Sequence, residues 1–238
     1  MSGTVSTEED RQRLGLVPLV SGMGRCVLVE EFNRILVTRV TLPGFRRRIA
    51  VFQEKDDLLP FEEAKLFGHN AIHAVLGYLA RLRGYAAMSQ IRADAELLAL
   101  GRAAFVEESG AALIRRHGGL GDALFTAAGF AAYAEDLLQR MTNPYLHDSV
   151  ERIIRDPARK LAWGDRLFGT MHMALDQGIA PRRIALGAAA ALLHVAPDRD
   201  VRGFLLGLWG KDASGPSVDA CIRLVEEAGQ EVPAFSRA

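Results

Sequence analysis

The clearest pattern in the chain is a helical one over residues 60–84, PFEEAKLFGHNAIHAVLGYLARLRG. Apolar side chains recur there at intervals of three and four, as they do in a helix that buries a broad face. These side chains are Phe61, Phe67, Ala71, Ala74, Val75, Tyr78, Leu79 and Leu82. The pattern predicts one long helix that packs into a core.

The chain after this helix also has helical periodicity, for example over residues 93–116 and 122–141. Breaks are expected where glycine, proline or asparagine interrupts the pattern, at residues 83–84, 117–121, 143–144, 156–157, 177–181, 196–197 and 214–216. Alanine is abundant and has the highest helix propensity of all residues. We therefore predict a mainly α, multi-helix domain.

The first sixty residues follow a different pattern. Residues 1–24 are polar and then glycine-rich, which predicts a flexible leader or linker. Residues 26–41, CVLVEEFNRILVTRVT, indicate one or two strands, or a strand that continues into a short helix, and residues 49–52 indicate another short strand. We expect a small β element near the N-terminus and divide the chain into a leader, 1–24, and a domain, 25–238.

Composition and charge restrict the class of protein. Hydrophobic residues make up 49% of the chain, and 29 basic residues balance 29 acidic ones, so no overall charge points to nucleic acid or an anionic membrane. Two distant cysteines argue against a disulfide scaffold or a zinc site. The longest apolar run, residues 184–195, is shorter than the ~20 residues of a membrane span. We expect a cytoplasmic protein without a membrane segment.

Four polar residues interrupt the apolar pattern of the long helix. At ~100° per residue, His69 and His73 lie roughly 40° and 80° round from Lys65, and Asn70 lies about 140° round. A partly buried lysine can act as a base near neutral pH, and amide and imidazole groups can hold a hydroxyl or carbonyl oxygen. The same pattern also fits a lysine that extends into water and histidines that only pack.

The spacing K-x4-N-x2-H of Lys65, Asn70 and His73 resembles the active-site helix of the polyol-specific long-chain dehydrogenases. This family includes mannitol-1-phosphate 5-dehydrogenase, mannitol 2-dehydrogenase and the tagaturonate and fructuronate reductases. NPYL at residues 143–146, RDPARKL at 155–161 and DRLFG at 165–169 resemble signatures of the mannitol-1-phosphate branch. The matching blocks run in the same order over about residues 27–196, which makes the resemblance specific.

The resemblance implies a fold and a set of roles. The fold is the α-helical domain of the 6-phosphogluconate dehydrogenase C-terminal type. Lys65 would be the general base that takes the hydroxyl proton, while Asn70 and His73 would hold the reacting oxygen and a neighbouring hydroxyl. No metal is implied, and a zinc site on His69 and His73 would lack further ligands.

An anionic substrate group, such as a phosphate or carboxylate, would bind to Arg155, Arg159 and Lys160. The same basic groups could instead pair with acids such as Glu151 or Asp165 across a buried turn. Arg140, shortly before the NPYL block, matches an arginine of the family.

Three positions depart from the family pattern. Met141 occupies a position where the family has phenylalanine, and Thr170 a position where it has proline. At position 72 isoleucine replaces a glycine beside the histidine, and we expect Ile72 to crowd whatever docks there.

Enzymes of this family carry NAD on an N-terminal Rossmann domain, and this chain has no alternating strands and helices with a glycine-rich turn. The glycine clusters at residues 22–24 and 118–121 predict a linker and a helix-capping turn, respectively, rather than a site for the pyrophosphate of NAD. NAD is thus implied by the family, but its binding domain is missing.

Three interpretations stay open. The chain is the substrate and catalytic half of a split NAD-dependent polyol-phosphate or sugar-acid dehydrogenase, inactive without a separate Rossmann chain; or a non-catalytic oligomerisation, scaffold or regulatory module; or a fragment of a longer enzyme. A homodimer is expected to cover the apolar face that the missing neighbour leaves open.

Overall fold

The computed structural model describes residues 4–5, 8–18, 20–23, 26–28, 34–196 and 200–235. It separates into two compact units, Met1–Leu58 and Leu59–Ala238. The division expected after residue 24 stays a prediction, and parts of the predicted leader, strand region and break at 196–197 lie outside the described residues.

The N-terminal unit contains short strands and one short helix. They are β1 (Thr4–Val5), α1 (Glu8–Leu14), β2 (Val27–Leu28), β3 (Ile35–Thr38) and β4 (Phe52–Lys55). β1 pairs with β2 in antiparallel orientation, and β3 pairs with β4 in parallel orientation. The predicted β element near the N-terminus is confirmed.

The second unit is helical, as predicted. Among the described residues its α-helices are α2 (Leu59–Glu63), α3 (Ala71–Leu82), α4 (Ala95–Ala103), α5 (Ala111–His117), α6 (Ala127–Met141), α7 (Val150–Ile154), α8 (Pro157–Lys160), α9 (Phe168–Asp176), α10 (Arg182–Val195), α11 (Val201–Trp209) and α12 (Ser217–Glu231). Two π-helical segments are η1 (Ala64–Asn70) and η3 (Ala104–Gly110), and short 3-10 turns are η2 (Met88–Ala93), η4 (Gly118–Leu120), η5 (Ala123–Phe125), η6 (Pro144–Leu146) and η7 (Val232–Phe235).

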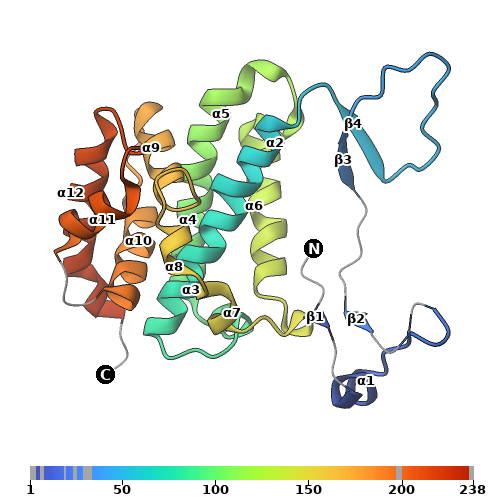
Figure 1. The fold of residues 1–238 in the computed structure, drawn as a ribbon, viewed down its shortest axis with the longest axis horizontal. Coiled ribbons are helices and arrows are strands. Elements are labelled where there is room, and N and C mark those ends of the chain that lie inside the picture. Colours follow the sequence, from blue (N-terminus) through green and yellow to red (C-terminus); the bar gives the residue numbers. More distant parts are fainter. Residues whose placement is uncertain are drawn as a thin grey trace. The chain divides into compact units, whose positions relative to one another are not determined.

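The predicted long helix is confirmed, because α2, η1 and α3 follow one another without a break from residue 59 to 82 (Figure 1). It ends at Leu82, and Gly84, two residues later, has a φ of 72° that suits a residue without a side chain. The expected breaks near Gly121 and Gly178 also carry glycines with positive φ. The wider π-helical turn of η1 within the helix was not predicted.

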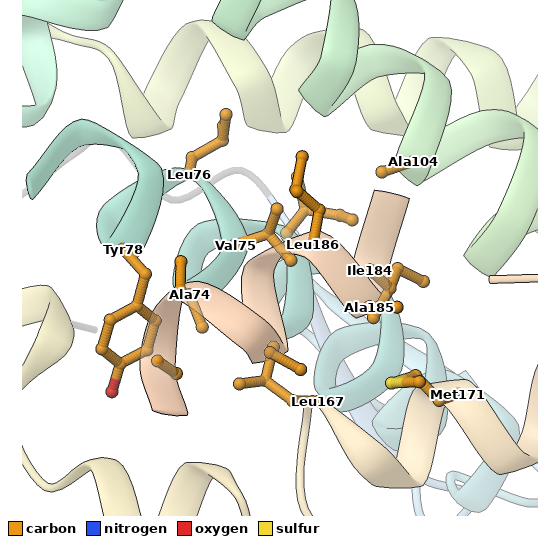
Figure 2. Packing of buried hydrophobic residues seen from close by; sticks show 14 of the residues in the cluster. Ala74, Val75, Leu76, Tyr78, Ala104, Leu167, Met171, Ile184, Ala185 and Leu186 are labelled. Atoms are coloured by element: carbon orange, nitrogen blue, oxygen red, sulfur yellow. The ribbon is translucent and has the colours of Figure 1, made fainter. Parts of the chain in front are cut away.

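The core of this unit forms where α3 packs against α10. Figure 2 shows side chains of α3, η3, α9 and α10 gathered there, among them Val75, Met171 and Leu186. The two helices approach closely at Gly187, where a Cβ atom would lie 2.6 Å from a side-chain carbon of Val75. Small residues on α10 allow this contact, so the alanine-rich stretch serves packing.

Two buried hydrogen bonds connect the core to the chain segment that runs from the end of α7 to the start of α9. The hydroxyl of Tyr78 donates to the carbonyl of Ile154 at 3.0 Å, and the indole N–H of Trp209 donates to the carbonyl of Leu161 at 2.8 Å. Each removes the penalty of an unpaired buried polar group and so fixes where this segment lies on the core. Within the described ranges, no helix combines the length and apolar character needed to cross a bilayer.

Candidate functional site

The polar residues predicted for the site lie where the long helix changes from π to α geometry. Lys65 and Asn70 belong to η1, and His73 lies in the first turn of α3. Lys65 is exposed rather than partly buried, while Asn70 and His73 are half-buried. Residues five positions apart differ by about 140° on an α-helix, but the wider i→i+5 turn brings Lys65 and Asn70 nearer to one side of the helix.

His73 has the most unusual environment of the three. Its Nε2 is buried without a hydrogen-bond partner among the described residues. Its ring stacks on His69, with centroids 5.8 Å apart and planes 20° apart. Burial first, and then the charges of His69, Arg152 and Arg166, lower the pKa of His73 to about 3. The ring is therefore neutral near pH 7, and its buried nitrogen can bond a ligand hydroxyl.

Lys160, the last residue of α8, is the second buried polar group of the site. It is 4% exposed and forms no ion pair with any described residue. Burial, followed by the nearby charges of Arg166 and Arg159, lowers its pKa to about 8, and Asp156 and Asp165 oppose that shift. A buried amine beside two guanidinium groups is suited to an anionic ligand group.

Arg166 connects the two groups. Its charge lowers the pKa of both His73 and Lys160, so Arg166 acts electrostatically on two residues that come from separate segments. Asp165 holds Arg166 by an Nε–H hydrogen bond of 2.7 Å. Arg152, which pairs with Asp148, also acts on His73. The sequence pattern did not lead us to predict either arginine as a site residue. Arg166 lies within the DRLFG block and Arg152 lies shortly before the RDPARKL block, and this position could have indicated them.

The other basic candidates are closer to solvent. Arg155 and Arg159 are exposed, and Arg159 donates a 2.7 Å hydrogen bond to Asp156. Arg140, in the last turn of α6, forms an ion pair of 3.6 Å with Asp136. Among the predicted anion-binding residues, only Lys160 is buried.

The side chain of Ile72 is 0% exposed and belongs to the hydrophobic core. That it crowds a docking ligand stays a prediction. Consecutive helical residues point about 100° apart, which places Ile72 inside while His73 faces the site. Thr170 is also fully buried, and its hydroxyl donates to the carbonyl of Arg166 at 2.6 Å.

The described residues do not fit an NAD site. The connection between β3 and β4, residues 39–51, contains a turn but no helix, so it lacks the strand–helix–strand unit that holds a dinucleotide. The second glycine cluster, residues 118–121, forms the turn after α5 with no strand before it, as expected of a helix cap.

Comparison with known proteins identifies the family and the fold. Residues 57–204, more than half of the chain, match the family model described as mannitol dehydrogenase C-terminal domain. Among solved structures the chain is similar to the Pseudomonas fluorescens mannitol 2-dehydrogenase ternary complex with NAD and D-mannitol, with a TM-score of 0.56 and 21% sequence identity. The match covers 97% of this chain but only 44% of that chain, and at this identity it shows the fold alone.

Proposed function

Because the chain belongs to the mannitol dehydrogenase C-terminal domain family, we propose that it supplies the substrate-binding and acid–base half of an NAD-dependent dehydrogenase. Its substrate would be a polyol phosphate or a sugar acid. The observation that carries this proposal is the buried, unpartnered Nε2 of His73 on the same helix as Lys65. Such a nitrogen costs free energy unless a ligand completes its hydrogen bond.

The proton chemistry would belong to the long helix. Lys65, with no ion pair among the described residues, takes the proton of the reacting hydroxyl in oxidation and returns it in reduction. His73 remains neutral and holds a substrate oxygen, and Asn70 offers an amide to the reacting oxygen. This division of roles needs one proton acceptor and two orienting groups, and the helix carries an amine, an amide and an imidazole.

The charged end of the substrate would bind Lys160 and Arg166. Arg166 acts electrostatically on both Lys160 and His73. Lys160 is buried and forms no ion pair with a carboxylate of the described residues, so an entering phosphate or carboxylate would supply the missing negative charge. Arg166 keeps its orientation through Asp165. An uncharged polyol would leave this buried positive charge unpaired, and we therefore expect the chain to prefer an anionic substrate.

NAD would be held by another polypeptide or by a further segment of a longer protein, since the residues described here do not fit it. When bound, NAD would accept the hydride from the substrate. The neighbour that carries NAD would cover Lys65, which is exposed in this chain. The chain spans less than half of the matched dehydrogenase, in agreement with a missing half.

Isothermal titration of the chain with D-mannitol 1-phosphate, D-mannitol and NADH tests the proposal. We expect the phosphate ester to bind more tightly than mannitol, Lys160→Met to weaken it about tenfold, and the exposed control Lys211→Met to leave it unchanged. Stoichiometric binding of NADH would contradict the proposed division of labour. Failure of the phosphate ester to bind at millimolar concentration would favour the scaffold interpretation instead.

A further inference from the structure

One buried hydroxyl lies against the backbone of the π-helical segment. The hydroxyl of Ser109, on η3, donates to the carbonyl oxygen of Phe67 at 2.7 Å. The hydroxyl of Thr170, on α9, lies 3.3 Å from the same oxygen but only 2.6 Å from the carbonyl of Arg166, so its single hydrogen is mainly directed to Arg166. Ser109 and Thr170 are both 0% exposed, and neither belongs to the site described above.

The carbonyl of Phe67 needs this donor because of the π geometry. In an α-helix it would accept the N–H of Ala71, four residues later. Here the N–H of Ala71 bonds to the carbonyls of Leu66 and Gly68 and bypasses Phe67. A buried carbonyl deprived of its helical donor is costly, and the Ser109 hydroxyl replaces that donor. The hydrogen bond thus stabilises the π-helical turn against the ordinary α-helical one.

The π-helical turn determines the directions in which Lys65 and Asn70 project from the helix. Phe67 stands between Lys65 and Asn70, so any change of helical register at its carbonyl rotates one of these residues relative to the other. The α-helical alternative would place them about 140° apart, too far round for both to reach one substrate oxygen. π-Helical turns within α-helices are frequent at functional sites for this kind of reason.

We propose that Ser109 is a positioning residue: its hydrogen bond to the Phe67 carbonyl holds η1 in π geometry and so places Lys65 and Asn70 on one side of the helix. Thr170 supports the same carbonyl as a secondary partner. The inference rests on the proposed function, since the placement matters only if these two residues meet a substrate. Ser109 acts through the backbone and touches no ligand.

The test uses Ser109→Ala in the full chain and measures hydrogen-bond couplings across the backbone by NMR. Such couplings identify which carbonyl accepts each N–H. In the unmodified chain, Ala71 should couple to Leu66 or Gly68; in Ser109→Ala it should couple to Phe67, because the α-helical bond then becomes the better one. Unchanged couplings in the variant would overturn the proposal.

A matched control separates positioning from general loss of stability. Thr142, the residue after the end of α6, also has a buried hydroxyl; it is 3% exposed and donates to the carbonyl of Leu138 in α6 at 2.9 Å. Thr142→Ala should leave the couplings of Ala71 and the affinity for mannitol 1-phosphate unchanged, while Ser109→Ala should weaken that affinity about tenfold. A changed coupling with unchanged affinity would refute the positioning role. If the unmodified chain binds no mannitol 1-phosphate, the proposed function fails, but the couplings still decide whether Ser109 holds the turn.

Discussion

The environment of His73 predicts how the stability of the chain depends on pH. Burial and the nearby positive charges lower the pKa of His73 from 6.5 to about 3. The unfolded chain therefore binds a proton at this residue between pH 6.5 and pH 3, where the folded chain does not. Above pH 6.5 His73 therefore does not reduce the free energy of unfolding, and this free energy falls as the pH falls from 6.5 towards 3.

The size of this effect follows from the shift. One pKa unit corresponds to about 1.4 kcal/mol, so protonation of the unfolded state at His73 should lower the free energy of unfolding by about 2 kcal/mol between pH 8 and pH 5. His73→Gln removes the titrating ring and should remove this part of the pH dependence. Urea unfolding at pH 8, 6.5 and 5, followed by circular dichroism, measures it.

Differences between variants isolate His73 from other titrating groups. Burial also lowers the pKa of His172, but that contribution is the same in the unmodified chain and in His73→Gln and cancels. The exposed His194 provides the matched control, and His194→Gln should keep the pH dependence of the unmodified chain. The reasoning is refuted if His73→Gln loses as much stability between pH 8 and pH 5 as the unmodified chain does.

Three further predictions concern stability. The folded-state pKa of Lys160 is about 8, so its charged form destabilises the folded chain. The free energy of unfolding should therefore rise from pH 8 towards pH 10 as the folded chain holds the neutral amine. In denaturant titrations, Lys160→Met should abolish this rise and increase the free energy of unfolding at pH 7 by on the order of 2 kcal/mol. Gly187→Ala should lower the melting temperature by forcing α3 and α10 apart, at about 2 kcal/mol, whereas Gly207→Ala, with nothing within 4 Å of its added Cβ, should be neutral or stabilising. The buried Glu108 carboxylate accepts hydrogen bonds from two backbone N–H groups at the start of α10, at 2.9 and 3.0 Å. Glu108→Ala should therefore lower the free energy of unfolding in urea by about 2–3 kcal/mol. The control Glu107→Ala removes an exposed carboxylate and should lower it by about 0.5 kcal/mol or less. Equal losses within either pair would contradict the packing and capping roles.

The structure also bears on the choice between the catalytic and scaffold interpretations. Ile72, which replaces the family's glycine beside the histidine, lies in the hydrophobic core. A chain adapted only to scaffolding would gain nothing from a buried histidine nitrogen without a partner, because an apolar residue would pack there at lower cost. This observation favours the catalytic proposal that the experiments above are designed to test.

Local sequence determined much of this protein. Apolar spacing predicted the long helix through residues 60–84, and Gly84, Gly121 and Gly178 marked helix ends because each adopts a backbone conformation that side chains disfavour. The spacing of Lys65, Asn70 and His73, together with the later blocks, was sufficient for the family, which the comparison confirmed. These features depend on residues close in sequence, so a linear pattern can display them.

Tertiary structure decided what the linear pattern could not. The π-helical turn depends on Ser109 reaching the Phe67 carbonyl from another segment, and uniform helical spacing therefore misplaced Asn70 relative to Lys65. The electrostatic effect of Arg166 on both His73 and Lys160 likewise depends on how distant segments of the chain fold together. Burial and electrostatic coupling arise from neighbours that are distant in sequence, and only the folded chain specifies which neighbours those are.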